Sequence, residues 1–169
     1  MVKAVKKKLR EMGVKKAHLN VGQYWVPYMF TDGRAFPPNS ITVELTFRCN
    51  LSCQMCPLDA PRVMYNRSDP EYVADRKRHE LGTDEVLALV DDIARMGVKN
   101  ITLTGGEAFL RPDMFQILER IKARGLSVCV NTNGWFLTKA HARRLVELGT
   151  DALSISVDGP NETHDVVRR

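Results

Sequence analysis

The chain has 169 residues, of which 44% are hydrophobic and 27% charged, a balance typical of one soluble globular domain with a core of its own. No apolar run approaches the ~18 residues of a membrane-spanning helix, so no membrane span is expected. The net charge of +5 arises at the N-terminus, because residues 1–16 alone carry +6, so nucleic acid is not expected as a partner.

The first 39 residues are predicted to form a basic helix and an irregular lead-in. Four apolar residues recur at helical spacing: Val2, Val5, Leu9 and Met12. We expect a solvated helix on the outside of the domain, and contact of its basic face with acidic lipid, RNA or a partner is the alternative. Residues 17–39 are rich in aromatic residues, glycine and proline, which favours irregular structure.

Three cysteines, Cys49, Cys53 and Cys56, follow a strand-like run at residues 40–47. Thiolates at this C-x3-C-x2-C spacing can converge on one soft metal centre. A zinc site needs a fourth Cys or His, and none follows at the usual spacing, which favours an iron–sulfur cluster with one iron open. A zinc site completed from elsewhere in the fold is the alternative. Clustered, oxidisable thiols favour a reducing, cytoplasmic location.

Residues 57–81 form a long stretch without a clear period, which we expect to cover the metal centre. Three amphipathic helical patterns follow, at residues 83–97, 112–125 and 138–149. Thr83 and Thr138 are the expected caps of the first and third, Pro112 is the expected start of the second, and a glycine ends each. Each glycine leads into a β-rich run: residues 101–104, 127–132 and 152–157. Strict alternation predicts an α/β fold, a partial TIM-like barrel of about four parallel βα units.

The predicted strands end in polar residues, and in a βα barrel these ends open onto the face that holds the active site. The candidates are Gly105, Gly106 and Glu107 after the second strand, Thr132 and Asn133 after the third, and Ser156 after the fourth. A glycine pair lets the backbone approach a ligand closely, and a glutamate can accept hydrogen bonds from an ammonium group. A tight βα turn is the alternative interpretation of the glycines.

Residues 40–160 contain four motifs in the order C-x3-C-x2-C, GGE, TNG and SVDG. In both its motifs and their order, this segment resembles the radical S-adenosylmethionine (radical SAM) superfamily. The resemblance implies that Cys49, Cys53 and Cys56 hold a [4Fe–4S] cluster as its metal ligands and catalytic residues. The open iron would take the amino and carboxylate groups of S-adenosylmethionine. The remaining cofactor contacts are implied at Gly105, Gly106 and Glu107 for the amino group, Met55 near the adenine, and Thr132 or Asn133 with Ser156 for ribose and carboxylate.

The resemblance also implies a reaction. One electron from the reduced cluster would break the sulfonium S–C5′ bond, and the resulting 5′-deoxyadenosyl radical would remove a hydrogen from the substrate. The SVDGP segment is similar to that of peptide-modifying maturases and the molybdenum-cofactor cyclase branch, which favours a peptide or small-metabolite substrate. Flavodoxin or ferredoxin is the expected electron donor. A module that holds a cluster or cofactor without turnover is the alternative.

Two features differ from the family pattern. Ala108 stands where the family usually has proline after GGE, which should loosen a turn without removing a ligand. The family barrel normally has six strands, whereas only four are predicted here. We therefore expect residues 40–169 to be an incomplete core domain: a fragment, a truncated product, or half of a barrel completed by a partner chain, with an unpaired edge.

Cys129 is expected to be a buried structural thiol; a ligand of a second cluster is the alternative.

Overall fold

The computed structural model describes residues 37–56 and 80–168. The chain divides into two units between Pro38 and Asn39, and all the elements below belong to the second. The predicted N-terminal helix and lead-in lie almost entirely outside the described residues, as do positions 57–79 of the predicted covering segment.

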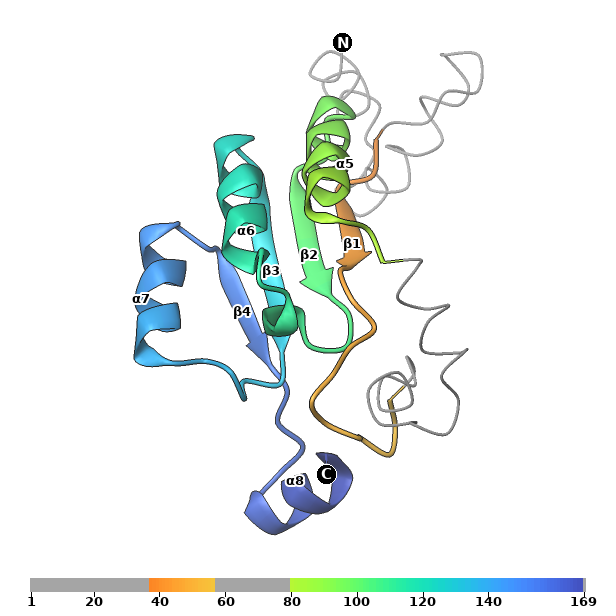
Figure 1. Cartoon of the computed structure of the whole chain (residues 1–169), viewed down its shortest axis with the longest axis vertical. Helices are drawn as coiled ribbons and strands as arrows, with labels where there is room; N and C mark the ends of the chain where they lie inside the picture. Colours follow the sequence, from red (N-terminus) through yellow and green to blue (C-terminus); the bar gives the residue numbers. More distant parts are fainter. Residues whose placement is uncertain (1–36, 57–79, 169) are drawn as a thin grey trace, which may run out of the picture. The chain divides into compact units, whose positions relative to one another are not determined.

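Four parallel strands form one sheet in the order β1-β2-β3-β4, with a helix between successive strands (Figure 1). The strands are β1 (Ser40–Glu44), β2 (Asn100–Thr104), β3 (Ser127–Thr132) and β4 (Ala152–Ile155). The helices are α5 (Thr83–Arg95), α6 (Met114–Ala123), α7 (Lys139–Glu147) and α8 (Asn161–Arg168), and a 3-10 turn, η1 (Ala108–Leu110), precedes α6. The prediction of an α/β fold with parallel βα units is confirmed.

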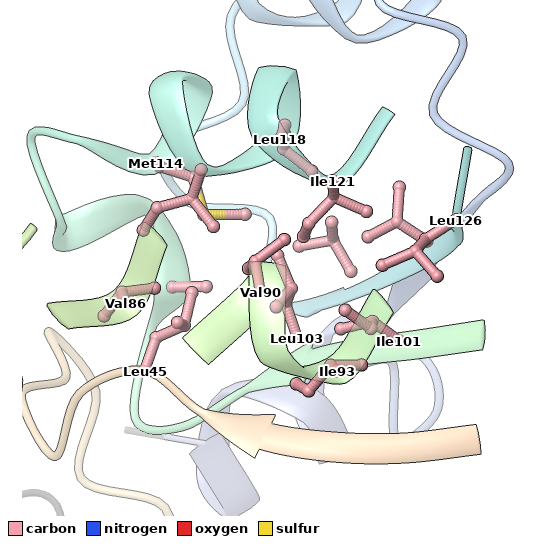
Figure 2. Packing of buried hydrophobic residues seen from close by; sticks show 14 of the residues in the cluster. Leu45, Val86, Val90, Ile93, Ile101, Leu103, Met114, Leu118, Ile121 and Leu126 are labelled. Carbon is pink, nitrogen blue, oxygen red and sulfur yellow. The ribbon is translucent and has the colours of Figure 1, made fainter. Parts of the chain in front are cut away.

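The core lies between the sheet and helices α5 and α6 (Figure 2). Alternate residues of the two central strands face it, and Ile101 and Val130 are almost completely buried. The apolar stripes of both helices cover them, with Val90 of α5 and Leu118 of α6 near the middle. Each such side chain contributes about 1.5–3 kcal/mol through burial, so this layer holds the strand ends in a fixed relation.

The other face of the sheet is polar. The strand register places Glu44 beside Thr104 on this face, and Asn131 beside Ser154. Cys129 points to this face too, and it is half-buried, so the prediction of a buried structural thiol is corrected. The reason is that β3 buries Val128 and Val130 in the core beneath the helices, which leaves Cys129 and the other alternate residues on the open side.

Most predicted boundaries shift by one or two residues, and β1 ends at Glu44, three residues before the end of the predicted run. Thr138 caps α7 as predicted, since its hydroxyl accepts a hydrogen bond from His141 N at 3.1 Å. Thr83 is not the cap of α5: Gly82 occupies that position, and the Thr83 hydroxyl instead donates to Asp113 Oδ2 at 2.7 Å. The prediction that α6 starts at Pro112 is wrong by two residues, because η1 and the Arg111–Asp113 pair precede the helix.

Strand β4 is exposed along its whole length. It pairs with β3 on one side, and within residues 37–56 and 80–168 no strand pairs with its other edge. Among the helices of these residues, none is long and apolar enough to cross a membrane.

Candidate cofactor site

A pocket of about 350 Å³ opens at the carboxyl ends of the strands. Its walls come from the cysteine loop, from the ends of all four strands and from α8. All of the predicted site residues except Glu107 line it. The fold therefore brings together residues that lie about a hundred positions apart in the chain.

The three clustered cysteines are free thiols that share this pocket. Cys49 is buried, and its Sγ accepts a hydrogen bond from Leu51 N at 3.5 Å, while Cys53 and Cys56 are half-buried. Burial raises the pKa of the Cys49 thiol, the Leu51 N–H opposes this, and the other two thiols and Glu107 add to the rise.

The three sulfurs do not form a ready-made site for one ion. In the described part of the chain, no three Cys, His, Asp or Glu side chains converge tightly enough to hold a single metal ion. Each thiolate of a cluster binds a different iron, so its ligands stand farther apart than those of a tetrahedral zinc. Three soft sulfur donors around one pocket fit a [4Fe–4S] cluster with one iron left for an outside ligand.

Backbone contacts between the ends of β1 and β2 hold the base of the cysteine loop. Gly106 N donates to Thr46 O at 2.7 Å, and Glu107 N donates to Arg48 O at 2.8 Å, one residue before Cys49. A Cβ on Gly105 would lie 2.4 Å from Thr46 O, and one on Gly106 would lie 2.2 Å from Arg48 O. Both positions therefore require glycine, because the two backbone segments approach too closely for a side chain.

Glu80 also fixes this base. Its Oε1 accepts hydrogen bonds from Thr46 Oγ1 at 2.7 Å and from Phe47 N at 2.9 Å. Its Oε2 lies 3.5 Å from Arg48 Nε. The sequence offered no signal for Glu80, because it belongs to no motif and lies more than thirty residues from its partners.

Glu107 is 0% exposed and does not line the pocket. Its Oε1 accepts from Thr132 Oγ1 at 2.8 Å and from Phe109 N at 3.0 Å. Its Oε2 accepts from Asn133 N at 2.8 Å. The carboxylate thus ties the end of β2 to the end of β3, and its contact with a cofactor ammonium group stays a prediction.

The turn after β3 reaches the cysteine loop through Asn133. The Asn133 Nδ2 atom lies 2.9 Å from Asn50 Oδ1 and 3.9 Å from Cys49 Sγ, as a donor to both. The turn itself is ordered, because Thr132 Oγ1 accepts from Gly134 N at 3.0 Å. The turn after β3 thus contacts the cysteine loop that follows β1.

Helix α8 adds a residue that the sequence analysis missed, Arg168. Gln54 of the cysteine loop donates from its backbone N to Val167 O at 3.1 Å, at the C-terminal end of α8. Arg168 lines the pocket and forms an ion pair with Asp158, which lowers the pKa of that carboxyl. The sequence does contain a signal for α8, because a short amphipathic pattern follows the SVDG segment, and this pattern ends in arginine.

Residues 43–169 match the family model of the radical SAM superfamily. The chain belongs to the radical SAM superfamily. The match begins within β1 and includes the three cysteines, the GGE segment and the ends of all the strands after β1.

Named relatives agree with this assignment. An AdoMet-dependent heme synthase of Methanosarcina barkeri is 39% identical over 132 residues, which cover 78% of this chain and 34% of that protein. A GTP 3′,8-cyclase of Lactiplantibacillus plantarum is 40% identical over 120 residues, which cover 70% of this chain and 33% of that protein. The chain therefore spans about a third of the length of these relatives.

A solved structure supports the fold. Streptococcus suis SuiB, bound to the precursor peptide SuiA, superposes with a TM-score of 0.64 at 14% identity, over 98% of this chain and 39% of that one. At this identity the likeness concerns the fold alone, and it agrees with a partial TIM-like barrel.

Proposed function

We propose that the chain is the cofactor-binding part of a radical SAM enzyme, with Cys49, Cys53 and Cys56 as ligands of a [4Fe–4S] cluster. The observation that carries the proposal is one pocket that holds all three thiols together with the glycine pair after β2. When bound, the cluster supplies the electron that cleaves S-adenosylmethionine to a 5′-deoxyadenosyl radical, which abstracts a hydrogen from the substrate.

The chain's own residues have distinct parts in this proposal. Gly105 and Gly106 line the pocket beside the cysteine loop, which suits contact between their backbone and the methionine amino group. The Arg168 guanidinium suits the methionine carboxylate, because a charge-assisted, bidentate contact can form there. The ion pair with Asp158 holds the guanidinium in place before the ligand arrives.

The nucleoside contacts are assigned to the remaining lining residues. Ser156 offers a hydroxyl for the ribose, and the Thr132 hydroxyl oxygen or Asn133 Oδ1, each of which accepts one hydrogen bond already, can accept a second from a ribose hydroxyl. Met55 is 50% exposed and lines the pocket, which suits an apolar contact with the adenine. Hydrogen bonds orient the ligand at several points, which is what a one-electron transfer over a short distance needs.

The substrate is proposed to be a peptide or a small metabolite. The relatives' names point to tetrapyrrole and nucleotide substrates, and a structural neighbour binds a precursor peptide. Glu44, Thr104 and Asn131 of the polar sheet face line the same pocket, and they offer hydrogen-bonding groups for a polar substrate. A flavodoxin or ferredoxin is proposed as the electron donor.

The test is anaerobic reconstitution of the full chain with iron and sulfide, followed by dithionite and S-adenosylmethionine. We expect about four irons and four acid-labile sulfides per chain, and 5′-deoxyadenosine as product. Cys49→Ser should lose the cluster, whereas the matched control Cys129→Ser should keep it, because Cys129 does not line the pocket. Colourless zinc-loaded protein, or an intact cluster without 5′-deoxyadenosine, would contradict the proposal.

A further inference from the structure

One side-chain amide approaches a sulfur of the cysteine loop. Asn133 Nδ2 lies 3.9 Å from Cys49 Sγ, within the longer range of hydrogen bonds to sulfur, and 2.9 Å from Asn50 Oδ1. An amide nitrogen carries two hydrogens, so both contacts can form at once. Cys49 is the buried member of the three thiols, where a donor is not replaced easily by water.

The orientation of this amide is determined by its other contacts. Asn133 Oδ1 accepts a hydrogen bond from Trp135 N at 2.9 Å. A backbone N–H can only donate, so the oxygen must face Trp135 and the NH2 group must face Cys49. The backbone of Asn133 is held as well, because its N–H donates to Glu107 Oε2 at 2.8 Å.

We propose that Asn133 is a positioning residue that donates a hydrogen bond to the Cys49 thiolate and thereby raises the reduction potential of the cluster, with Glu107 holding Asn133 in place. The inference rests on the proposed function, since it requires Cys49 to be a cluster ligand. It assigns to Asn133 an action on the cluster that is separate from any contact with S-adenosylmethionine.

The direction of the effect follows from charge. Reduction adds one negative charge, which spreads onto the ligand sulfurs. A donor that points at one of these sulfurs stabilises the reduced state more than the oxidised state, and hydrogen bonds of this kind tune cluster potentials. Without the amide, the cluster should be harder to reduce.

The experiment is a redox titration of the reconstituted full chain without S-adenosylmethionine, in which the EPR signal of the reduced cluster is measured against potential. Asn133→Leu, of similar size but without a donor, should shift the midpoint to more negative values. Asn131→Leu is the matched control, since Asn131 lines the same pocket but its side-chain contact is with Cys129. Equal midpoints for wild type and Asn133→Leu would overturn the inference.

A second pair covers the case in which a leucine is not tolerated. Asn133→Asp and Asn131→Asp each add one negative charge to the pocket, but only the first removes a donor from Cys49. The first should therefore give the larger negative shift, and equal shifts would overturn the inference.

Glu107→Gln tests the positioning step. A glutamine places its NH2 group against Asn133 N–H or against Phe109 N–H and the Thr132 hydroxyl, which weakens the hold on the Asn133 segment, but it also removes one negative charge near the cluster. The effect of Asn133→Leu is therefore compared in the two backgrounds, where the charge change cancels. Asn133→Leu should shift the midpoint less in the Glu107→Gln background than in the wild-type background, because both changes weaken the same contact. Additive shifts would overturn the role of Glu107.

If the wild-type chain forms no cluster, the proposed function fails. If the cluster is intact but its midpoint does not respond to Asn133→Leu, only this inference fails.

Discussion

At the scale of single residues, the glycine pair after β2 is needed to place the cysteine loop. The sequence predicted that these glycines let the backbone approach a ligand, and both do line the pocket. Their closest contacts, however, are with the backbone of Thr46 and Arg48, just before Cys49. A substitution there should therefore disturb the loop before any ligand binds.

Gly106→Ala should prevent stable cluster assembly while the sheet remains folded. A Cβ would lie 2.2 Å from Arg48 O, so the loop that carries Cys49 must move away. Gly82→Ala is the control, because its Cβ would meet nothing closer than Glu85 Oε2 at 3.6 Å. Iron content and far-UV circular dichroism of both variants provide the check, and normal iron content in Gly106→Ala would contradict the expectation.

The Cys49 thiol also predicts how assembly depends on pH. Burial raises its pKa, and iron binds the thiolate, so a smaller fraction is ready to bind at neutral pH. Cluster assembly should therefore speed up as pH rises through the alkaline range, above the ordinary thiol value of about 8.5. The rate of growth of the cluster's visible absorbance between neutral and alkaline pH measures this, and a flat profile would count against it.

At the scale of elements, a buried ion pair joins the segments around α5 and α6. The Arg111 and Asp113 side chains are 6% and 8% exposed. Arg111 also donates to Leu45 O and Leu81 O, each at 3.0 Å, so one guanidinium ties the end of β1 to the segment before α5. Breaking such a pair leaves a buried charge without a partner.

Arg111→Met should therefore lower the free energy of unfolding by about 3 kcal/mol. The control is Arg95→Met, since the Arg95–Asp92 pair is mostly exposed and such a pair contributes at most about 0.5 kcal/mol. Urea denaturation of both variants gives the two values. Similar losses in the two variants would show that the buried pair has no special role.

The same pair predicts a response to acid. The hydrogen bond from Arg111 lowers the pKa of Asp113, and although burial opposes this, the Thr83 hydroxyl adds to the lowering. A lowered folded-state pKa gives stability that is present above the ordinary carboxyl value of about 3.9 and is lost as pH falls through the folded value. Unfolding measured below about pH 4 should show this loss, and Asp113→Asn should lose less stability over the same range.

The elements themselves could be predicted well from local pattern. Apolar periodicity and glycine stops located three helices and their strands, and β3 has the predicted limits, because these signals are local. The errors arise where distant residues decide. Thr83 could cap α5, but its hydroxyl bonds Asp113, thirty positions away, and η1 depends on the buried carboxylate of Glu107.

At the scale of the whole molecule, motif order predicted which residues meet at the pocket, because parallel strands bring their carboxyl ends to one edge. It could not predict which of them face the pocket. Glu107 turns inward to three hydrogen-bond donors, while Arg168 enters the pocket from a helix outside every motif. Such choices depend on side-chain packing between segments, which no local pattern encodes.

The free edge of β4 is expected to cause self-association of the 169-residue chain. Leu153 and Ile155 are 37% and 51% exposed, and in the described residues no strand pairs with this edge. An apolar strand with free backbone groups recruits another strand, so the apparent mass should rise with protein concentration. Ile155→Lys should weaken this, because a charge on an edge strand opposes pairing, whereas Met96→Lys, equally exposed at the end of α5, should not. Sedimentation over a range of concentrations measures the difference, and equal association of both variants would place the contact elsewhere.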